Sequence, residues 1–569
     1  MPNPMVFLAI FMPQKKIPLI NPSIFSKHKL LFLSIASGLL LAASWPARGL
    51  PVLAFIAFIP LFLVEQELFA KREGNRSIRF FLYAWLAFFV WNLLTTWWIV
   101  FSTVPGAITA VVLNSLFMAI PWWLMHCWRR LVPKHQGPFP VILFWLSFEY
   151  LHTKWDLSWN WLDLGNVFAP WPKWIQWYEF TGTAGGAIWI LVVNLLLYLL
   201  LKEVTGFGKF TKSARWYAAV AACVLLIPIL LSHRIYARFV ERPDPVEVVI
   251  VQPSFDPYQS PQSLIEANMR TEEMLALAEI KLTDSTRFVA APEAILPEGI
   301  WMHQAEFNRH VLMIRNQIFR NPQLKWIAGS LVYQAYAAGE EVPHTARYFE
   351  AQGIYFDTFN SAVKIGPFGE IEFYHKSMLV PGVERMPFFR VLRPIGKIVE
   401  AFGGTAGSLG TQDYREVFET GPDQPVIAPV ICYESIYGDF MSGFIRNGAT
   451  MIFILTEDGW WRRTPGHRQH HEYARLRAIE FRRPIVRAAG TGISSFIDQK
   501  GNVLQRTEWW ETTAIRQTVN QNNQMTYFAM HGNVAGRLSV FLSALLLLAM
   551  LTRIIITRKK SLHSKEKGS

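Results

Sequence analysis

The chain has 569 residues, of which 51% are hydrophobic and 17% are charged, and it carries a formal net charge of +13. A soluble protein carries about a quarter charged residues, so this composition excludes a purely soluble protein. Much of the lysine and arginine excess lies in short loops between apolar stretches and in the tail, a pattern of membrane orientation that argues against nucleic-acid binding.

Eight apolar stretches approach the roughly 20 residues that a membrane-spanning helix needs. They lie at residues 29–47, 50–66, 79–101, 105–127, 138–153, 180–201, 216–233 and 536–556, and the second and fifth are short. We therefore expect a transmembrane bundle of about seven spans over residues 1–240. A soluble domain should follow over residues 241–535, and residues 536–569 should form a final span with a basic tail.

The positive charge lies in alternate loops between these stretches. Lysines and arginines precede the first stretch and follow the second, fourth and sixth, whereas the intervening loops have few. The positive-inside rule then predicts a cytoplasmic N-terminus, and seven spans predict an extracytoplasmic soluble domain. The longest intervening loop, residues 154–179, is rich in tryptophan, and we expect its indoles to anchor in the lipid headgroup layer.

The soluble part alternates apolar, β-branched runs with helical patterns. The runs fall at residues 246–253, 288–291, 326–332, 426–432, 451–455 and 485–488, and the helical patterns at 261–282, 301–319 and 466–482. Strands alternating with helices predict an α/β sheet architecture.

A reactive side chain directly follows an apolar run in three segments of this domain. Glu293 lies in FVAAPEAILPE, Lys376 in FYHKSMLVPGVERMP and Cys432 in VIAPVICYESIYGD. Strand ends are where α/β sheets hold their ligand sites. Each residue alone is more often structural or solvated. Together they provide a nucleophile, a base that can take the thiol proton and a cation that can stabilise an oxyanion.

The order Glu, Lys, Cys in the contexts APE, HK and CYE resembles the nitrilase, or carbon–nitrogen hydrolase, superfamily. Two long segments are further similar to the pattern of bacterial apolipoprotein N-acyltransferases: FNSAVKIGPFGEIEFYHKSMLVPGVERMP and GHRQHHEYARLRAIEFRRPIVRAAGTGISSFIDQKG. The predicted position of the domain, between seven spans and a final one, matches that family as well.

The resemblance implies a nitrilase-like αββα sandwich and thioester chemistry at Cys432. It implies Glu293 as the general base and Lys376 as the oxyanion-stabilising cation, with three supporting residues: Glu384, Glu434 and Tyr433. Members of the family transfer an acyl chain from a phospholipid to the N-terminal diacylglyceryl-cysteine of an apolipoprotein. This last step of lipoprotein maturation takes place at the outer face of the bacterial inner membrane, and it needs no cofactor.

The chain departs from the family pattern at two positions near the expected pocket. Glu457 in TEDGWW and Gly490 in RAAGTG stand where the family typically has asparagine. The lysine motif also reads VPGVERMP in place of VPFGEYVP, with the glutamate kept. We expect these changes to affect the donor or acceptor preference more than the reaction.

Other functions are less well supported by the sequence. His467, His470 and His471 share one predicted helix, but the arrangement is far from HExxH and no metal is expected. The glycine-rich segment 402–410 lacks the lysine of a phosphate-binding loop. A membrane-tethered amidase remains an alternative, because it could use the same three residues. A transporter is disfavoured, since the sequence shows no inverted repeat.

A basic and apolar segment follows the lysine motif at residues 385–402. Its phenylalanines are interleaved with arginines, and Pro394 should interrupt any helix formed there. We expect a mobile arm that dips into the outer leaflet beside Glu384. A buried helix of the domain is the alternative.

Overall fold

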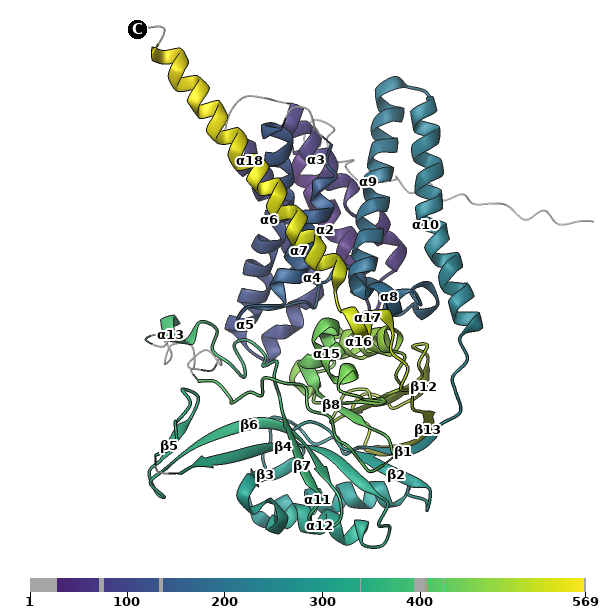
Figure 1. The fold of residues 1–569 in the computed structure, drawn as a ribbon, viewed down its shortest axis with the longest axis vertical. Helices are drawn as coiled ribbons and strands as arrows, with labels where there is room; N and C mark the ends of the chain where they lie inside the picture. Colours follow the sequence, from purple (N-terminus) through teal and green to yellow (C-terminus); the bar gives the residue numbers. More distant parts are fainter. Residues whose placement is uncertain are drawn as a thin grey trace, which may run out of the picture.

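The computed structural model describes residues 28–70, 76–132, 137–337, 339–392, 394, 405, 407–422 and 424–566. It consists of a helical bundle with an α/β domain at one end (Figure 1). The bundle helices are α2 (Lys29–Ser44), α3 (Ile59–Ala70), α4 (Arg76–Thr96), α5 (Val104–Ile108), α6 (Asn114–Leu131), α7 (Pro140–His152), α8 (Tyr178–Thr181), α9 (Thr183–Phe207), α10 (Lys212–Arg238) and α18 (Val534–Glu566).

Six helical stretches of the described chain are long and apolar enough to cross a membrane. These are Pro51–Ala70, Ser77–Phe101, Val104–Leu131, Thr183–Phe207, Lys212–Arg238 and Val534–Lys559. Helices α2 and α7, with 16 and 13 residues, stand where the first and fifth spans were predicted. The multi-pass bundle is thus confirmed, although the count of eight is approximate. The second span is longer than predicted because α3 continues past residue 66 to Ala70; a 3₁₀ turn at Pro51–Phe55 precedes it.

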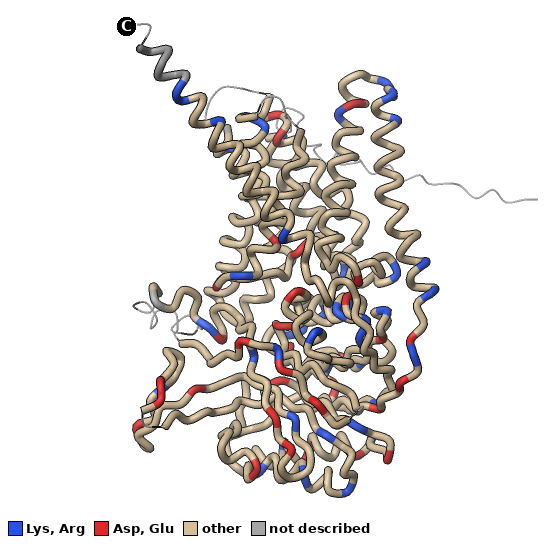
Figure 2. The backbone as a smooth tube through the Cα atoms, viewed as in Figure 1, with Lys and Arg blue, Asp and Glu red and all other residues tan. Residues whose placement is uncertain are grey.

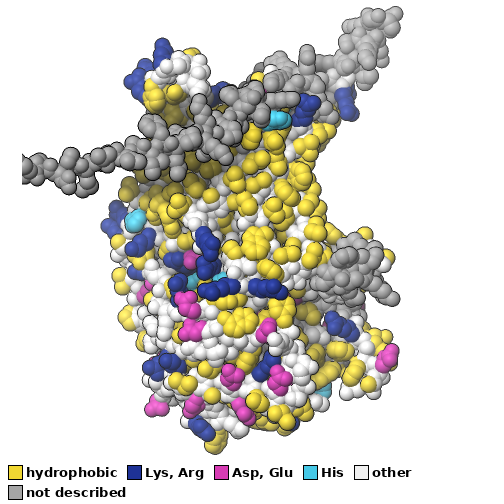
Figure 3. Space-filling model, turned by 180° about the vertical axis from the view of Figure 1, so that it is seen from behind, with side chains coloured by type: hydrophobic (Ala, Val, Ile, Leu, Met, Phe, Trp, Pro, Cys, Tyr) yellow, Lys and Arg dark blue, Asp and Glu magenta, His cyan; other side chains and the backbone are white. Residues whose placement is uncertain are grey.

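The surface of the bundle differs from that of the α/β domain. Hydrophobic side chains cover the helices, whereas the domain surface is mixed (Figure 3). Charged residues are sparse along the helices and gather at the bundle end far from the domain, including the α9–α10 turn (Figure 2). A surface that is apolar along the helices and charged at their ends fits a lipid environment.

The α/β domain contains two stacked sheets. The larger has the order β13-β1-β2-β4-β6-β5, with β3 paired to β4 and β7 to β6, and the smaller has the order β12-β11-β10-β9-β8. The strands are β1 (Pro245–Gln252), β2 (Thr286–Ala290), β3 (Leu296–Trp301), β4 (Lys325–Tyr336), β5 (Arg347–Phe349), β6 (Ile354–Ile365), β7 (Ile371–His375), β8 (Ile427–Ile431), β9 (Met451–Thr456), β10 (Ile485–Ala489), β11 (Ser495–Ile497), β12 (Val503–Arg506) and β13 (Thr513–Asn520).

Helices cover the outer face of each sheet and complete four layers (Figure 1). Helices α11 (Leu264–Glu279) and α12 (Arg309–Ile318) lie on the larger sheet, and α15 (Gly438–Arg446) and α16 (Pro465–Phe481) on the smaller. All six predicted strands are confirmed, as are the helices at 261–282 and 466–482. The predicted helix at 301–319 is wrong in its first half, because β3 and a 3₁₀ turn at Met302–Phe307 precede α12, which begins after the Asn308 cap.

The layer formed by α15 and α16 faces the bundle, and side chains of α16 form hydrogen bonds with the N-terminal part of the chain. The indole of Trp45 donates to the Tyr473 hydroxyl at 2.9 Å, and the indole of Trp161 donates to Gln469 at 2.7 Å. These hydrogen bonds are buried between apolar surfaces. They fix the orientation of the domain on the bundle, because an indole N–H left buried without an acceptor would be costly. The domain is therefore held with α15 and α16 against the bundle.

Candidate active site

The three side chains predicted from strand ends lie around one cavity of about 1280 Å³. Glu293 follows β2, Lys376 directly follows β7 and Cys432 directly follows β8. These strands belong to both sheets, so the site lies where the two layers meet. The cavity extends from the three residues to the bundle, since side chains from both parts line it.

Lys376 is held between two carboxylates. Its Nζ lies 3.0 Å from Glu293 Oε1 and 2.9 Å from Glu384 Oε1, and the ammonium is buried. Burial alone would lower the pKa of Lys376, but the Glu293 and Glu384 carboxylates outweigh it and hold the pKa well above its ordinary value. Lys376 is therefore a fixed positive charge beside the nucleophile.

Asn360 on β6 joins the same two acids and was not recognised from the sequence. Its amide Nδ2 donates to Glu293 Oε1 at 2.7 Å and to Glu384 Oε1 at 2.8 Å. The second oxygen of Glu293 accepts from the backbone N–H of Glu457 at 3.1 Å. These neutral donors hold the Glu293 carboxylate in one orientation without neutralising it.

Cys432 directly follows β8 and is the first residue of a 3₁₀ helix at Cys432–Ile436, where the backbone is strained. Its φ is +45°, in the left-handed region that a residue with a side chain rarely adopts. Such strain often accompanies functional positions. Burial raises the pKa of the Cys432 thiol, the Glu293 carboxylate raises it further, and Lys376 partly opposes both. The resting group is a neutral thiol, which needs a base before it can attack.

Glu434 connects the turn of the nucleophile to the segment that carries Lys376. One oxygen accepts from the Tyr374 hydroxyl and the Ser377 N–H, both at 2.7 Å, and the other from the Ile431 N–H at 2.9 Å. Burial raises the pKa of Glu434 to about 7 despite these bonds. Glu434 thus fixes the spacing of two reactive groups that lie on different sheets.

Tyr433 forms part of an aromatic wall beside Cys432. Its ring stacks on Trp159 at 6.0 Å between centroids, and Trp159 stacks on Trp161 at 5.5 Å. Trp161 is buried against Trp98 at 5.0 Å. The predicted headgroup anchoring is therefore wrong for Trp161, because its ring packs inside the protein between the bundle and α16.

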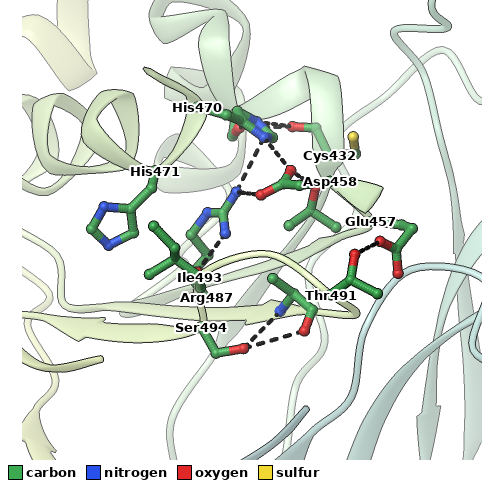
Figure 4. Close-up of polar contacts among 12 residues, drawn as sticks. Cys432, Glu457, Asp458, His470, His471, Arg487, Thr491, Ile493 and Ser494 are labelled. Carbon is green, nitrogen blue, oxygen red and sulfur yellow. Dashed lines mark hydrogen bonds and ion pairs between the residues drawn. The ribbon is translucent and has the colours of Figure 1, made fainter. Parts of the chain in front are cut away.

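A buried network behind Cys432 was also missed (Figure 4). His470 Nδ1 lies 2.9 Å from one oxygen of Asp458, and Arg487 donates to the other at 2.8 Å. Burial would raise the pKa of Asp458, but Arg487 and His470 outweigh it and hold the pKa well below its usual range. His470 Nε2 lies 2.9 Å from the Ser435 hydroxyl and 3.3 Å from the Cys432 carbonyl oxygen. The network therefore supports the backbone of the nucleophile turn.

The three histidines considered for a metal have separate partners. His471 Nε2 lies 3.0 Å from the Ser495 hydroxyl, and His467 packs against Trp509 with centroids 4.3 Å apart. His470 belongs to the network with Asp458. Over the described ranges, no group of three or more His, Cys, Asp or Glu side chains could hold a metal ion.

The start of the predicted arm borders the cavity. Arg385 pairs with Asp156 Oδ1 at 2.9 Å, and the Phe388 N–H donates to Oδ2 of the same residue at 2.9 Å. The Phe388 ring is 41% exposed and lies 6.2 Å from Trp155. A short helix, α13 (Phe389–Leu392), follows. Arg393 and residues 395–402 lie outside the described residues, so the rest of the arm stays a prediction.

Comparisons with known proteins cover both parts of the chain. Residues 37–196 match the family model "Apolipoprotein N-acyltransferase N-terminal domain", and residues 233–523 match "Carbon-nitrogen hydrolase". Similar proteins named "Apolipoprotein N-acyltransferase" occur in Chlorobaculum tepidum, at 27% identity over 92% of this chain and 97% of the relative, and in Geobacter metallireducens, at 25% identity over 93% and 96%. A third, from Thermotoga maritima, is 24% identical over 90% of this chain and 92% of the relative.

Proposed function

The chain belongs to the apolipoprotein N-acyltransferases of the carbon–nitrogen hydrolase family, and from this premise we propose its donor, acceptor and mechanism. The donor is a phospholipid, and the acceptor is the α-amino group of the diacylglyceryl-modified N-terminal cysteine of an apolipoprotein. Cys432 carries the acyl chain between them as a thioester. Glu293 is the base and Lys376 the oxyanion-stabilising cation.

The observation that carries the proposal is the size and lining of the cavity. Its volume of about 1280 Å³ exceeds the roughly 300–1,000 Å³ of common small-molecule sites. Apolar side chains of the bundle line it beside the reactive residues, among them Ile99, Leu113 and Phe117. A small amide would leave most of this apolar space unfilled, whereas an acyl chain would fill it. The cavity therefore favours a lipid donor over the amidase alternative.

In the first half-reaction, Glu293 takes the proton of the Cys432 thiol and the thiolate attacks the carbonyl carbon of a phospholipid ester. Lys376 stabilises the oxyanion of the tetrahedral intermediate. The intermediate collapses as the carbon–oxygen bond to the glycerol breaks. Glu293 returns its proton to that oxygen, and lysophospholipid leaves.

In the second half-reaction, the lipoprotein amine attacks the thioester carbon. Glu293 takes a proton from the amine, the carbon–sulfur bond breaks, and the amide product leaves a thiolate that regains the proton. Glu384 and Glu434 hold Lys376 and the nucleophile turn in place, and Tyr433 forms the wall beside them. Apolar surroundings exclude the water that would otherwise hydrolyse the thioester.

We further propose that the α/β domain lies on the extracytoplasmic side of the bacterial inner membrane. The α9–α10 turn and the helix ends beside it carry Lys202, Lys209 and Lys212, and the turn lies at the end of the bundle opposite the domain (Figure 2). Basic loops favour the cytoplasmic side. Single cysteines introduced at the exposed Ser213 and Ser285, in a background without native cysteines, provide the test. An impermeant thiol reagent should label position 285 and spare 213 in intact spheroplasts, and equal labelling would contradict this orientation.

The segment that begins at Arg385 is proposed to border the path of the lipid into the cavity. Phe388 supports this because its ring is partly exposed and lines the cavity. Phe388→Ser should slow lipid turnover at unchanged thermal stability. Phe319→Ser is the matched control, since Phe319 is 86% exposed at the end of α12, on the outer face of the domain. A stability loss in Phe388→Ser would instead favour a packed structural segment.

The overall function is tested with purified enzyme, phospholipid and a synthetic diacylglyceryl-cysteine peptide. We expect N-acyl peptide and lysophospholipid in equal amounts, and neither product with Cys432→Ala. Cys432→Ser should be nearly inactive, because a hydroxyl is much harder to ionise than a thiol beside the same base. Release of ammonia from amides without any acyl peptide would favour the amidase alternative.

A further inference from the structure

Glu457 is a further carboxylic acid that lines the cavity, and the mechanism above does not use its side chain. It directly follows β9, at the end of the smaller sheet, and lines the cavity together with Cys432 and Glu293. Figure 4 shows its carboxyl group on the Cys432 side of the strand ends, apart from the His470 network. Its backbone N–H already holds Glu293, so any side-chain role is additional.

The side chain of Glu457 extends over Gly490 at the end of the neighbouring strand, β10. A Cβ atom at position 490 would lie 1.7 Å from Glu457 Oε2, well inside any tolerated contact. The two departures from the family pattern are therefore one coupled feature. A single long side chain occupies the space that a side chain at 490 would need.

The two oxygens of Glu457 have different surroundings. Oε1 accepts from the Gly459 N–H at 2.6 Å and from the Thr491 hydroxyl at 2.5 Å. Oε2 has no hydrogen-bond partner among the described residues, although the side chain is only 8% exposed. Since Oε1 is occupied by two donors, a proton on this carboxyl group lies on Oε2, where no hydrogen bond to a described residue holds it.

The charged groups nearby favour a proton on Glu457. Lys376 is paired with Glu293 and Glu384, and Arg487 is paired with Asp458, so neither cation neutralises Glu457. Burial raises the pKa of Glu457 to about 8; the hydrogen bonds from Thr491 and the Gly459 N–H oppose this rise, and the negative charges of Asp458 and Glu293 add smaller effects in the same direction as burial. At neutral pH the group is a buried hydrogen-bond donor that lines the same cavity as Cys432.

We propose that Glu457 is a further catalytic residue, whose Oε2–H donates a hydrogen bond to the carbonyl oxygen of the acyl group at Cys432. It complements Lys376, which reaches the same oxygen with a positive charge. A neutral donor stabilises the oxyanion without attracting the Glu293 base, as a second cation would. The proposal rests on the acyl transfer proposed above and assigns it a second oxyanion donor.

Two substitutions of similar length separate donation from simple packing. Glu457→Gln keeps an acceptor for Gly459 and Thr491 and presents an NH₂ donor in place of Oε2–H. Glu457→Met removes the donor and the acceptor together. Acylation of Cys432 by phospholipid alone is measured by mass spectrometry from pH 6 to pH 9.5, with thermal unfolding of each variant as a check of folding.

We expect the wild-type rate to fall as pH rises through about 8, where Glu457 ionises and Oε2 stops donating. Glu457→Gln should acylate at a near wild-type rate at pH 7 and lose this alkaline decline. Glu457→Met should be slower by about 10²-fold at pH 7, the usual effect of removing one oxyanion donor.

Two outcomes overturn the role of Glu457 while acyl transfer stands: an alkaline decline that persists in Glu457→Gln, or a Glu457→Gln rate as low as that of Glu457→Met. A purely structural side chain would give the first of these results. A wild-type enzyme that is never acylated overturns the proposed function and this inference with it.

Discussion

The hydrogen bonds of Asn360 predict a large effect from a change of nearly identical shape. Asn360→Asp replaces the Nδ2 donor, 2.7 Å from Glu293 and 2.8 Å from Glu384, by a carboxylate oxygen. At an effective dielectric constant of about 20, each of these like-charge contacts costs about 6 kcal/mol, equivalent to about four pKa units. The three acids cannot all remain ionised beside the single Lys376 cation, so one takes up a proton at neutral pH.

We expect this proton to be shared among the three acids, one of which is the base Glu293. The acid limb of the pH profile of the acylation rate should then move upward by one to several pH units. At pH 7 the rate should fall by about tenfold or more, and it should partly recover above pH 8. Asn360→Ala is the matched control, because it removes the donor without adding a negative charge. Losing a hydrogen bond to the carboxylates should move the acid limb upward by much less than Asn360→Asp does. The assay is the rate of acyl-enzyme formation with phospholipid alone. An Asn360→Asp profile that coincides with wild type would refute the assignment of Glu293 as the base.

Three further outcomes follow from the buried charges of the domain. Arg487→Met leaves Asp458 buried without its guanidinium partner and should lower stability by about 3–5 kcal/mol. The control Arg516→Met, at a 40% exposed position, should cost less than about 1 kcal/mol. Thermal unfolding compares the two variants, and equal losses of stability would contradict the buried network of Asp458, His470 and Arg487. Gly490→Ala should destabilise by about 1–3 kcal/mol through overpacking against Glu457, and the loss should largely vanish in a Glu457→Ala background if the two positions share one space. The pKa of Glu457 in the folded protein lies near 8, above the ordinary 4.5, so its contribution to the free energy of unfolding is fully present below about pH 4.5 and is lost as pH rises to about 8. Glu457→Gln should flatten the fall in stability across that range. An unchanged dependence of stability on pH would argue against a protonated Glu457.

Much of the site could be predicted because its three main residues follow apolar strands directly. Glu293, Lys376 and Cys432 each lie within three residues of a strand end, and the ends of these strands meet where the sheets face each other. Asn360 could not be found in this way. It lies inside β6 among several other polar residues, and nothing in the sequence distinguishes the one that faces the two acids.

The network of Asp458, His470 and Arg487 depends on tertiary packing in the same way. Its members come from β9, α16 and β10, and only the docking of α16 on the smaller sheet brings them within hydrogen-bond distance. The helical spacing of the histidines suggested one shared face, yet His470 and His471 have different partners. The strands β12 and β13 were missed because their alternating exposure includes polar residues, which resemble loop sequence.

The role of Cys432 as carrier of the acyl chain between donor and acceptor can be tested by mass spectrometry of the enzyme itself. Purified enzyme is incubated with phospholipid and without any lipoprotein, and the intact protein and its Cys432 peptide are weighed by mass spectrometry. We expect one acyl group on Cys432, which is sensitive to hydroxylamine, absent from Cys432→Ala and discharged when the acceptor peptide is added. An enzyme that accumulates no such adduct, yet still acylates the acceptor when both substrates are present, would contradict this role.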